Sequence, residues 1–215
     1  AIVNSSNFKI QGDLTISDVA QSGIINSSVA NFNLNFGSTL NLSNVNDIGI
    51  SNTGIVTFDG VADLNMTGGN VGISNSGTIS VDGSVDIDGF NAVSYKSNGA
   101  SSFANGQCGV VSFAGQMETG AVGNFSNDRF FITQSPVANQ IGINFILINN
   151  GIIWDMEESF DGYYANIGNS NGAILVPRAT YPTGSIDPYY IGNPPFPVTL
   201  VNNEITFNGN PGATF

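Results

Sequence analysis

The sequence repeats itself at residues 49–66, which read GISNTGIVTFDGVADLNM, and at residues 72–89, which read GISNSGTISVDGSVDIDG. The second copy begins 23 residues after the first, and both copies carry an Asp-Gly pair at the same offset. A fixed period of this length is typical of stacked repeats, because each unit buries its apolar face only against its neighbours. The repeat therefore predicts a layered architecture for this part of the chain.

A period near 23 residues suits one coil of a β-solenoid, in which strands of about 3–5 residues are joined by tight turns. Gly60 and Gly83, within the two Asp-Gly pairs, are expected at corners that need a positive φ. The pairs expected to stack coil on coil are Asn52 with Asn75 and Thr57 with Ser80. The alternative interpretation is two similar β-hairpins of a sandwich, which produce the same alternation of apolar and polar residues.

The repeat fades on either side of these two copies. Residues 23–42 form a degraded copy and residues 8–17 a fragment, whereas residues 91–215 show no period and contain the single Trp. Asn149-Asn150-Gly151 between two apolar runs is typical of a β-hairpin, and residues 154–160 are the best candidate for a short helix. We therefore predict an all-β chain. Residues 1–89 form a solenoid-like or sandwich-like repeat region, and residues 90–215 form an antiparallel, jelly-roll-like β-sandwich with long loops.

Charge is scarce and unbalanced in this chain. Charged residues make up 9% of it, with 4 basic and 16 acidic residues and a net charge of −12. The cations are scattered, whereas nucleic acids and anionic membranes require clustered ones. The chain contains no run of 18 apolar residues, so the sequence predicts no membrane-spanning segment. We therefore expect no nucleic-acid partner and no membrane insertion. The small residues at the start fit a mature N-terminus left by signal-peptide cleavage, and so an extracellular location.

The sequence lacks the residue types and motifs on which many catalytic and metal sites depend. The chain has no histidine, which removes histidine-dependent triads and histidine-bound zinc. Its single cysteine, Cys108, rules out an internal disulfide, and apolar neighbours predict that its thiol is buried. No glycine-rich phosphate-binding loop is present. We therefore expect a protein that is not an enzyme and has no cofactor other than, in one interpretation, calcium.

Two acidic clusters are candidate calcium sites, because carboxylate oxygens suit that hard cation. They are Asp82, Asp86 and Asp88 in the second repeat, and Asp155, Glu157, Glu158 and Asp161 further along the chain. The second cluster lies beside aromatic residues, so it is also a candidate carbohydrate site, since rings stack on sugars and paired carboxylates share acid and base work. The simpler interpretation of both clusters is acidic residues at solvated turns.

Five N-glycosylation sequons permit glycans in an extracellular protein. The acceptor asparagines are Asn4, Asn26, Asn41, Asn65 and Asn124. Asparagine, serine and threonine are abundant throughout the chain, so this number of sequons matches what chance produces. The sequons therefore allow glycosylation without indicating it.

The pattern Ser-Asn-[Thr/Ser]-Gly-x-[Val/Ile], at residues 51–56 and 74–79, resembles repeats of secreted microbial β-solenoid adhesins and filament proteins, and shaft repeats of viral fibres. The resemblance covers roughly residues 23–89. It implies a structural protein at a cell or virion surface that assembles with copies of itself. Cell-surface glycans or a host receptor are the other partners it implies.

The leading hypothesis is a secreted subunit of an extracellular filament or surface coat, in which an edge strand of one copy completes the sheet of the next. Residues 1–10 and 204–207 are the candidate donor strands. The side chains expected to take part are Ile2, Phe8, Ile10, Ile205 and Phe207. The alternatives are a viral or phage spike with a receptor-binding head, and a carbohydrate-binding or carbohydrate-active protein.

Overall fold

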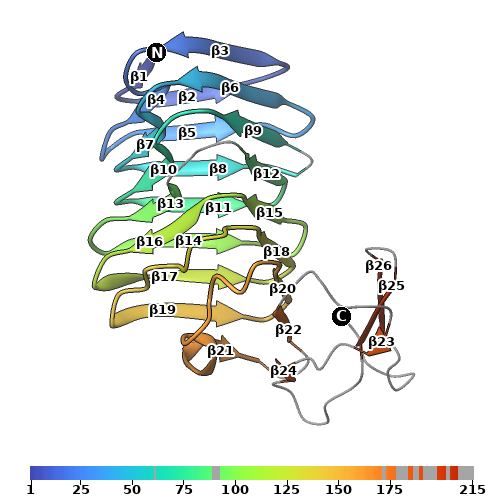
Figure 1. Ribbon diagram of the computed structural model, residues 1–215. Helices are drawn as coiled ribbons and strands as arrows, with labels where there is room; N and C mark the ends of the chain where they lie inside the picture. The colour runs from blue at the N-terminus through green and yellow to red at the C-terminus, as the bar shows by residue number, and fades with distance from the viewer. Residues whose placement is uncertain are drawn as a thin grey trace.

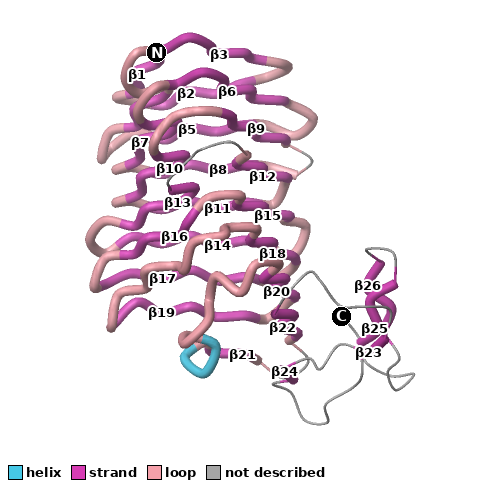
Figure 2. The backbone as a smooth tube through the Cα atoms, in the orientation of Figure 1, coloured by secondary structure: helices cyan, strands magenta, loops and turns pink. Residues whose placement is uncertain are grey.

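The computed structural model shows a β-solenoid of about seven turns, in which each complete turn adds one strand to each of three parallel sheets (Figure 1). The structure describes residues 1–60, 62–88, 93–170 and 173–177, and beyond them the backbone of four short strands. Strands occupy the flat sides of the coil and turns occupy its corners (Figure 2). The stacked architecture predicted from the repeat is confirmed.

The three sheets are named A, B and C in the order in which the chain first meets them. Sheet A contains β1 (Ile2–Asn4), β4 (Ile24–Asn26), β7 (Ile48–Asn52), β10 (Val71–Asn75), β13 (Val93–Ser97) and β16 (Gln116–Thr119). Sheet B contains β2 (Asn7–Ile10), β5 (Asn31–Leu34), β8 (Ile55–Phe58), β11 (Thr78–Val81), β14 (Ser101–Asn105), β17 (Val122–Asn127), β19 (Asn144–Asn149) and β21 (Gly168–Asn169). Sheet C contains β3 (Leu14–Val19), β6 (Thr39–Val45), β9 (Asp63–Thr67), β12 (Ser84–Ile87), β15 (Val110–Phe113), β18 (Phe130–Thr133), β20 (Ile152–Asp155), β22 (Ile174–Pro177) and the antiparallel β24 (Tyr189–Tyr190). A separate antiparallel sheet contains β23 (Gly184–Ser185), β25 (Val198–Val201) and β26 (Glu204–Phe207), and a 3-10 turn spans Tyr164–Asn166.

The register between coils follows the sequence repeat. Asn52 aligns with Asn75 and Thr57 with Ser80, as predicted. Gly60 has a φ of +63°, which confirms the expected left-handed corner. Gly83 is needed for a different reason: its backbone lies so close to the preceding coil that a side chain does not fit, and its φ is not positive. A Cβ there would collide with the carbonyl oxygen of Ala62 in the preceding coil.

Alternation along each strand places one set of side chains inside the coil. In β8, Val56 and Phe58 are fully buried, whereas Ile55, the first residue of the strand, is 48% exposed. Aromatic rings fill the later coils; those of Phe103 and Phe125 stack with centroids 4.7 Å apart and planes 8° from parallel. Stacking one coil on the next therefore produces a continuous apolar core along the solenoid.

Residues 93–177 continue the solenoid and do not form the predicted antiparallel sandwich. Asn149-Asn150-Gly151 is a corner of the coil rather than a hairpin, because β19 belongs to sheet B and β20 to sheet C, each parallel to its neighbours. Residues 154–160 form the end of β20 and a series of turns, not a helix. Turn residues and alternation look alike in both architectures, which is why the sequence misleads here. The remainder of the predicted sandwich lies largely outside the described residues.

A column of buried asparagines runs along the corner between sheets A and B. We call this the first asparagine column; its members, Asn4, Asn26, Asn52 and Asn75, end successive strands and are at most 6% exposed. Each Nδ2 donates to the Oδ1 of the next member, over 2.7, 2.8 and 2.9 Å in turn. Each also donates to a main-chain carbonyl of the following coil, as Asn52 does to Thr78 at 3.1 Å. The column thus satisfies buried polar groups that would be costly to leave unpaired.

A second asparagine column lies at a different corner, between sheets B and C. Its members are Asn105, Asn127, Asn149 and Asn169, joined by Nδ2–Oδ1 bonds of 2.7, 2.9 and 2.9 Å. The first column stops at Asn75, whose Nδ2 donates to the Tyr95 hydroxyl at 3.2 Å. Because the polar corner moves from one edge of the coil to another, the second half of the solenoid no longer resembles the first in sequence.

Candidate assembly surface at the first coil

Near the end of the solenoid closer to the C-terminus, the segment between β20 and β21 folds onto the core. Residues 156–166, after β20, bring Phe160 into the core, where it is 1% exposed and its ring centroid is 6.3 Å from that of Phe131. Tyr163 donates its hydroxyl proton to the carbonyl of Phe145 at 3.1 Å. In sheet C, β24 pairs antiparallel with β22. This closing segment, residues 156–166, thus adds the Phe160 ring to the core between β20 and β21.

A buried carboxylate, Asp155, holds the closing segment in place. It is fully buried and accepts four hydrogen bonds: 2.8 Å from each of the Ser159 amide, the Ser159 hydroxyl and the Phe160 amide, and 2.7 Å from the Tyr164 hydroxyl. Burial, and then the bond to Asp155, raise the pKa of Tyr164 above its usual value, so this hydroxyl keeps its proton and remains a donor. Asp155 is therefore engaged in holding a loop.

At the other end, the first coil (β1, β2 and β3) is the outermost coil of the described solenoid. Figure 1 shows this coil at the N-terminal end, with no strand beyond it among the residues described. Ile10 is buried at 5% exposed, but five other inward apolar side chains are only partly buried, although the residues aligned with those five in the second coil are 0 to 1% exposed. The aligned pairs are Ile2 with Ile24, Phe8 with Phe32, Leu14 with Leu40, Ile16 with Leu42 and Val19 with Val45.

The strands of the first coil also have unpaired main-chain groups. The carbonyls of Ser6 and Ile10 accept bonds of 2.8 and 3.1 Å from the second coil. Since successive residues of a strand direct their N–H and C=O groups to opposite sides, those of Asn7 and Lys9 point away from the second coil. By the same alternation, the main-chain N–H and C=O groups of Val3 in β1 also point away from the second coil. The first coil therefore exposes the kind of strand edge that pairs with another strand.

At this end the first asparagine column starts, among the residues described, with Asn4. Within the column, Oδ1 of Asn52 accepts both Asn26 Nδ2, at 2.8 Å, and the Gly54 amide, at 3.0 Å. Asn4 is 6% exposed, and its Oδ1 accepts the Ser6 amide at 3.2 Å but has no preceding asparagine in the described chain. One lone pair of a largely buried amide thus faces away from the second coil, where a further donor would satisfy it.

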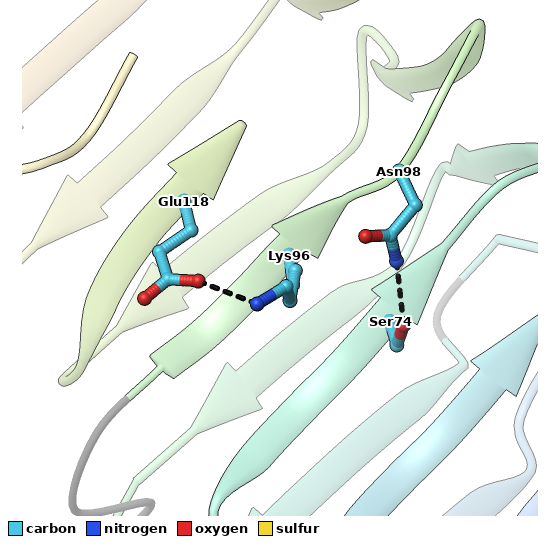
Figure 3. Close-up of polar contacts among 4 residues, drawn as sticks. All are labelled: Ser74, Lys96, Asn98 and Glu118. Carbon is cyan, nitrogen blue, oxygen red and sulfur yellow. Dashed lines mark hydrogen bonds and ion pairs between the residues drawn. The ribbon is translucent and has the colours of Figure 1, made fainter. Parts of the chain in front are cut away.

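The outer face of sheet A is apolar beside the first coil and polar further away. Val3 is 68% exposed, Ile25 38%, and Val29, at the adjoining corner, 82%. Several coils on, Lys96 Nζ lies 2.8 Å from a Glu118 carboxylate oxygen, and Asn98 donates to the Ser74 hydroxyl at 2.9 Å (Figure 3). Exposed ion pairs of this kind contribute little to stability. The apolar surface is thus continuous with the first coil.

The predicted donor residues of the N-terminus lie in this first coil. Ile2 is in β1, and Phe8 and Ile10 are in β2, each hydrogen-bonded into a parallel sheet. Residues 1–10 therefore offer a fixed edge rather than a free arm. Ile205 and Phe207 lie in β26, an outer strand of the three-stranded sheet, but their side chains lie outside the described residues.

The two acidic clusters do not form a metal site in the part of the chain that the structure describes, where no group of three or more candidate ligand residues is placed to hold a cation. Asp86, on the outer face of sheet C, aligns with Asn65 and Ser112 rather than with other carboxylates. It lines a shallow hollow of about 270 Å³ together with Asp88 and Gln134. In the second cluster, Asp155 is engaged as described above and Glu157 and Asp161 are exposed.

Cys108 lies in the turn between β14 and β15 and is exposed, so the prediction of a buried thiol is wrong. Its apolar neighbours belong to β15, where alternation buries Val111 and leaves Val110 39% exposed. The glycines on either side of Cys108 set it in the corner of the coil, away from the core.

The five sequon asparagines fall into two structural groups. Asn4 and Asn26 belong to the first asparagine column and are 6% and 1% exposed. Asn65 and Asn124 lie on outer faces and are exposed, and Asn41, which accepts a bond of 3.0 Å from Asn65, is half-buried beside it. Only the outward-facing asparagines can carry a glycan without disturbing the core.

We expect secretion from a glycosylating eukaryotic host to modify Asn65 and Asn124 but not Asn4 or Asn26. A glycan on either column asparagine would replace one of its two Nδ2 hydrogens and so remove one of the hydrogen bonds that link successive coils. Intact-mass and peptide mass spectrometry of the folded product check this site by site. Quantitative occupancy of Asn26 in folded protein would contradict the column.

No helix long and apolar enough to cross a membrane occurs among the residues the structure describes. Comparison with protein-family models, with curated proteins and with solved structures finds no match for this chain. Its function is therefore argued from the geometry above.

Proposed function

We propose that this protein is a structural subunit of an extracellular assembly, a filament or surface coat, and that it associates by strand addition at the edge of its first coil. The observation that carries the proposal is the difference between the two ends of one core. Near one end the closing segment places Phe160 in the core, whereas the first coil, the outermost one described, has five partly buried apolar side chains.

Repeat proteins need a covered last repeat at each end, because an uncovered one exposes core and strand edges together. Strand addition covers the strand edge and the core at the same time. Main-chain hydrogen bonds pair the edge, and the inward side chains of the added strand cover the core. A low charge also favours close association of copies, and only Lys9 among the residues of β1 and β2 is charged. The extracellular setting is supported by a surface of Asn, Ser and Thr rather than charge.

Replacing Lys9 with proline is expected to abolish self-association while leaving the coil folded. The Lys9 amide points away from the second coil, so proline removes a donor for the incoming strand without breaking a bond to the second coil. The matched control is Lys9→Ala, which removes the charge but keeps the amide. Sedimentation velocity and negative-stain electron microscopy measure association, and circular dichroism checks the fold.

We expect assemblies from the wild type and Lys9→Ala, and a shift of at least tenfold in the association constant for Lys9→Pro. Loss of association in both variants would assign the effect to charge rather than to the strand edge. A wild-type protein that remains monomeric at high micromolar concentration overturns the proposal.

A further inference from the structure

We propose that residues 178–215, the segment that follows β22, pack as a strap on the outer face of sheet C. The strap lies over β18, β20 and β22, the last parallel strands of that sheet (Figure 1). The contact lies within one chain, so it is independent of the proposed function.

The outer face of sheet C changes from polar to apolar along the stack. The register between its strands defines two rows of outward positions. One row contains Asp63, Ser84, Val110, Phe130, Ile152 and Ile174. The other contains Asn65, Asp86, Ser112, Ile132 and Trp154. From β18 onward both rows consist of large apolar residues, so this part of the face is suited to packing against another apolar surface.

The last outward residues of these rows are covered in the folded chain. Trp154 is 8% exposed and Ile174 is 1% exposed. Alternation directs both away from the core, because their strand neighbours Ile153 and Leu175 are the residues that belong to the cluster inside the coil. Val110, further back in the same row as Ile174, is 39% exposed. Cover therefore increases toward β22, where the chain continues into residues 178–215.

The indole of Trp154 gives a second indication of a covering segment. Its Nε1 is buried and has no hydrogen-bond partner among the residues described. An indole nitrogen can only donate, and a buried donor without an acceptor is costly. The strap is the part of the chain that supplies the acceptor.

The segment after β22 has the pattern that this face requires. In β24, Tyr190 aligns with Ile174, so the chain returns to this edge of sheet C after β22 ends. Further along, the register of β25 and β26 places four apolar positions on one face of the small sheet: Val198, Leu200, Ile205 and Phe207. The positions on its opposite face are Thr199, Val201, Glu204 and Thr206. A small sheet of this kind depends on burying its apolar face, and the outer face of sheet C offers an apolar surface in the same chain.

Fluorescence tests the contact directly, because Trp154 is the only tryptophan of the chain. We expect Leu200→Asp to move the emission of Trp154 to longer wavelength and to raise its quenching by acrylamide about threefold or more, since local opening exposes the ring. The matched control is Thr199→Asp, which adds the same charge on the opposite face of the small sheet and should change neither quantity. Circular dichroism checks that both variants keep the solenoid.

A change in Leu200→Asp with none in Thr199→Asp supports the strap. Equal responses of the two variants overturn it, as does a wild-type indole that acrylamide quenches freely. Quenching of the wild type that rises on dilution, with a dimer in sedimentation velocity, also overturns it and assigns the cover to a second copy. If Leu200→Asp fails to fold, Ile205→Asp with Thr206→Asp as its control replaces the pair, and the same outcomes decide.

Discussion

Replacing Asn52 with alanine is expected to lower the free energy of unfolding by about 3–5 kcal/mol, since removing one partner from each of several buried hydrogen bonds costs about 1–3 kcal/mol per group left unpaired. Asn52 accepts from Asn26 and the Gly54 amide, and donates to Asn75 and the Thr78 carbonyl. The alanine side chain replaces none of these bonds. Urea unfolding followed by circular dichroism measures the change.

The matched control is Asn65→Ala. Asn65 also bonds to the aligned asparagine of the neighbouring coil, Asn41, at 3.0 Å, but this bond lies on an exposed outer face. Water replaces the lost bond there, so we expect a change below about 0.5 kcal/mol. Equal losses in the two variants would mean that the first asparagine column contributes no more than surface pairing does.

The first half of the fold could be predicted from sequence because one polar corner is conserved in position from coil to coil. Asn52 and Asn75 occupy the same place in two coils of equal length, so the repeat is visible as identical letters. Gly60 could be predicted from turn chemistry alone. Gly83 could not be explained in that way, because its constraint is the Ala62 carbonyl of the neighbouring coil.

The second half could not be recognised by the same signal, because the asparagine column moves to another corner at Asn105. A different regularity was present: Asn105, Asn127 and Asn149 recur at intervals of 22 residues, each beside a turn. This period is carried by one residue type rather than by a repeated phrase. Turn residues and strand alternation alone predict a sandwich equally well, so only the buried asparagines distinguish the two folds.

The strands of the first coil could be predicted from the sequence, whereas their role in assembly stays a prediction. Residues 1–10 could be singled out as strand-forming, but not the form they take, because whether a terminal strand is a free arm or a fixed edge depends on its pairing with β4 and β5. The role of Asp155 was hidden for a related reason. Four acidic residues in a short segment suggest a solvated turn or a cation site, and sequence does not show that one of them is buried beneath four donors.

Replacing Asp155 with alanine is expected to lower the free energy of unfolding by about 3–5 kcal/mol, because it leaves several buried donors without an acceptor. The Ser159 and Phe160 amides are buried within the closing segment, so water cannot replace the lost acceptor. Loss of their acceptor should release Phe160 from the core and expose the last coil. Chemical denaturation measures the global loss, and hydrogen exchange should show the largest loss of protection at residues 156–166.

The control is Asp161→Ala, in the same segment and of the same charge. Asp161 is exposed, and its carboxylate accepts only a local bond of 2.9 Å from the Gly162 amide among the bonds described. We expect a change below about 0.5 kcal/mol there. If Asp155→Ala lost stability while self-association stayed intact, the two ends of the solenoid would be shown to act separately, one closed by the chain and the other by a partner. If Asp155→Ala unfolded no more easily than Asp161→Ala, the closing segment would not be what covers the core, and the contrast between the two ends would lose its basis.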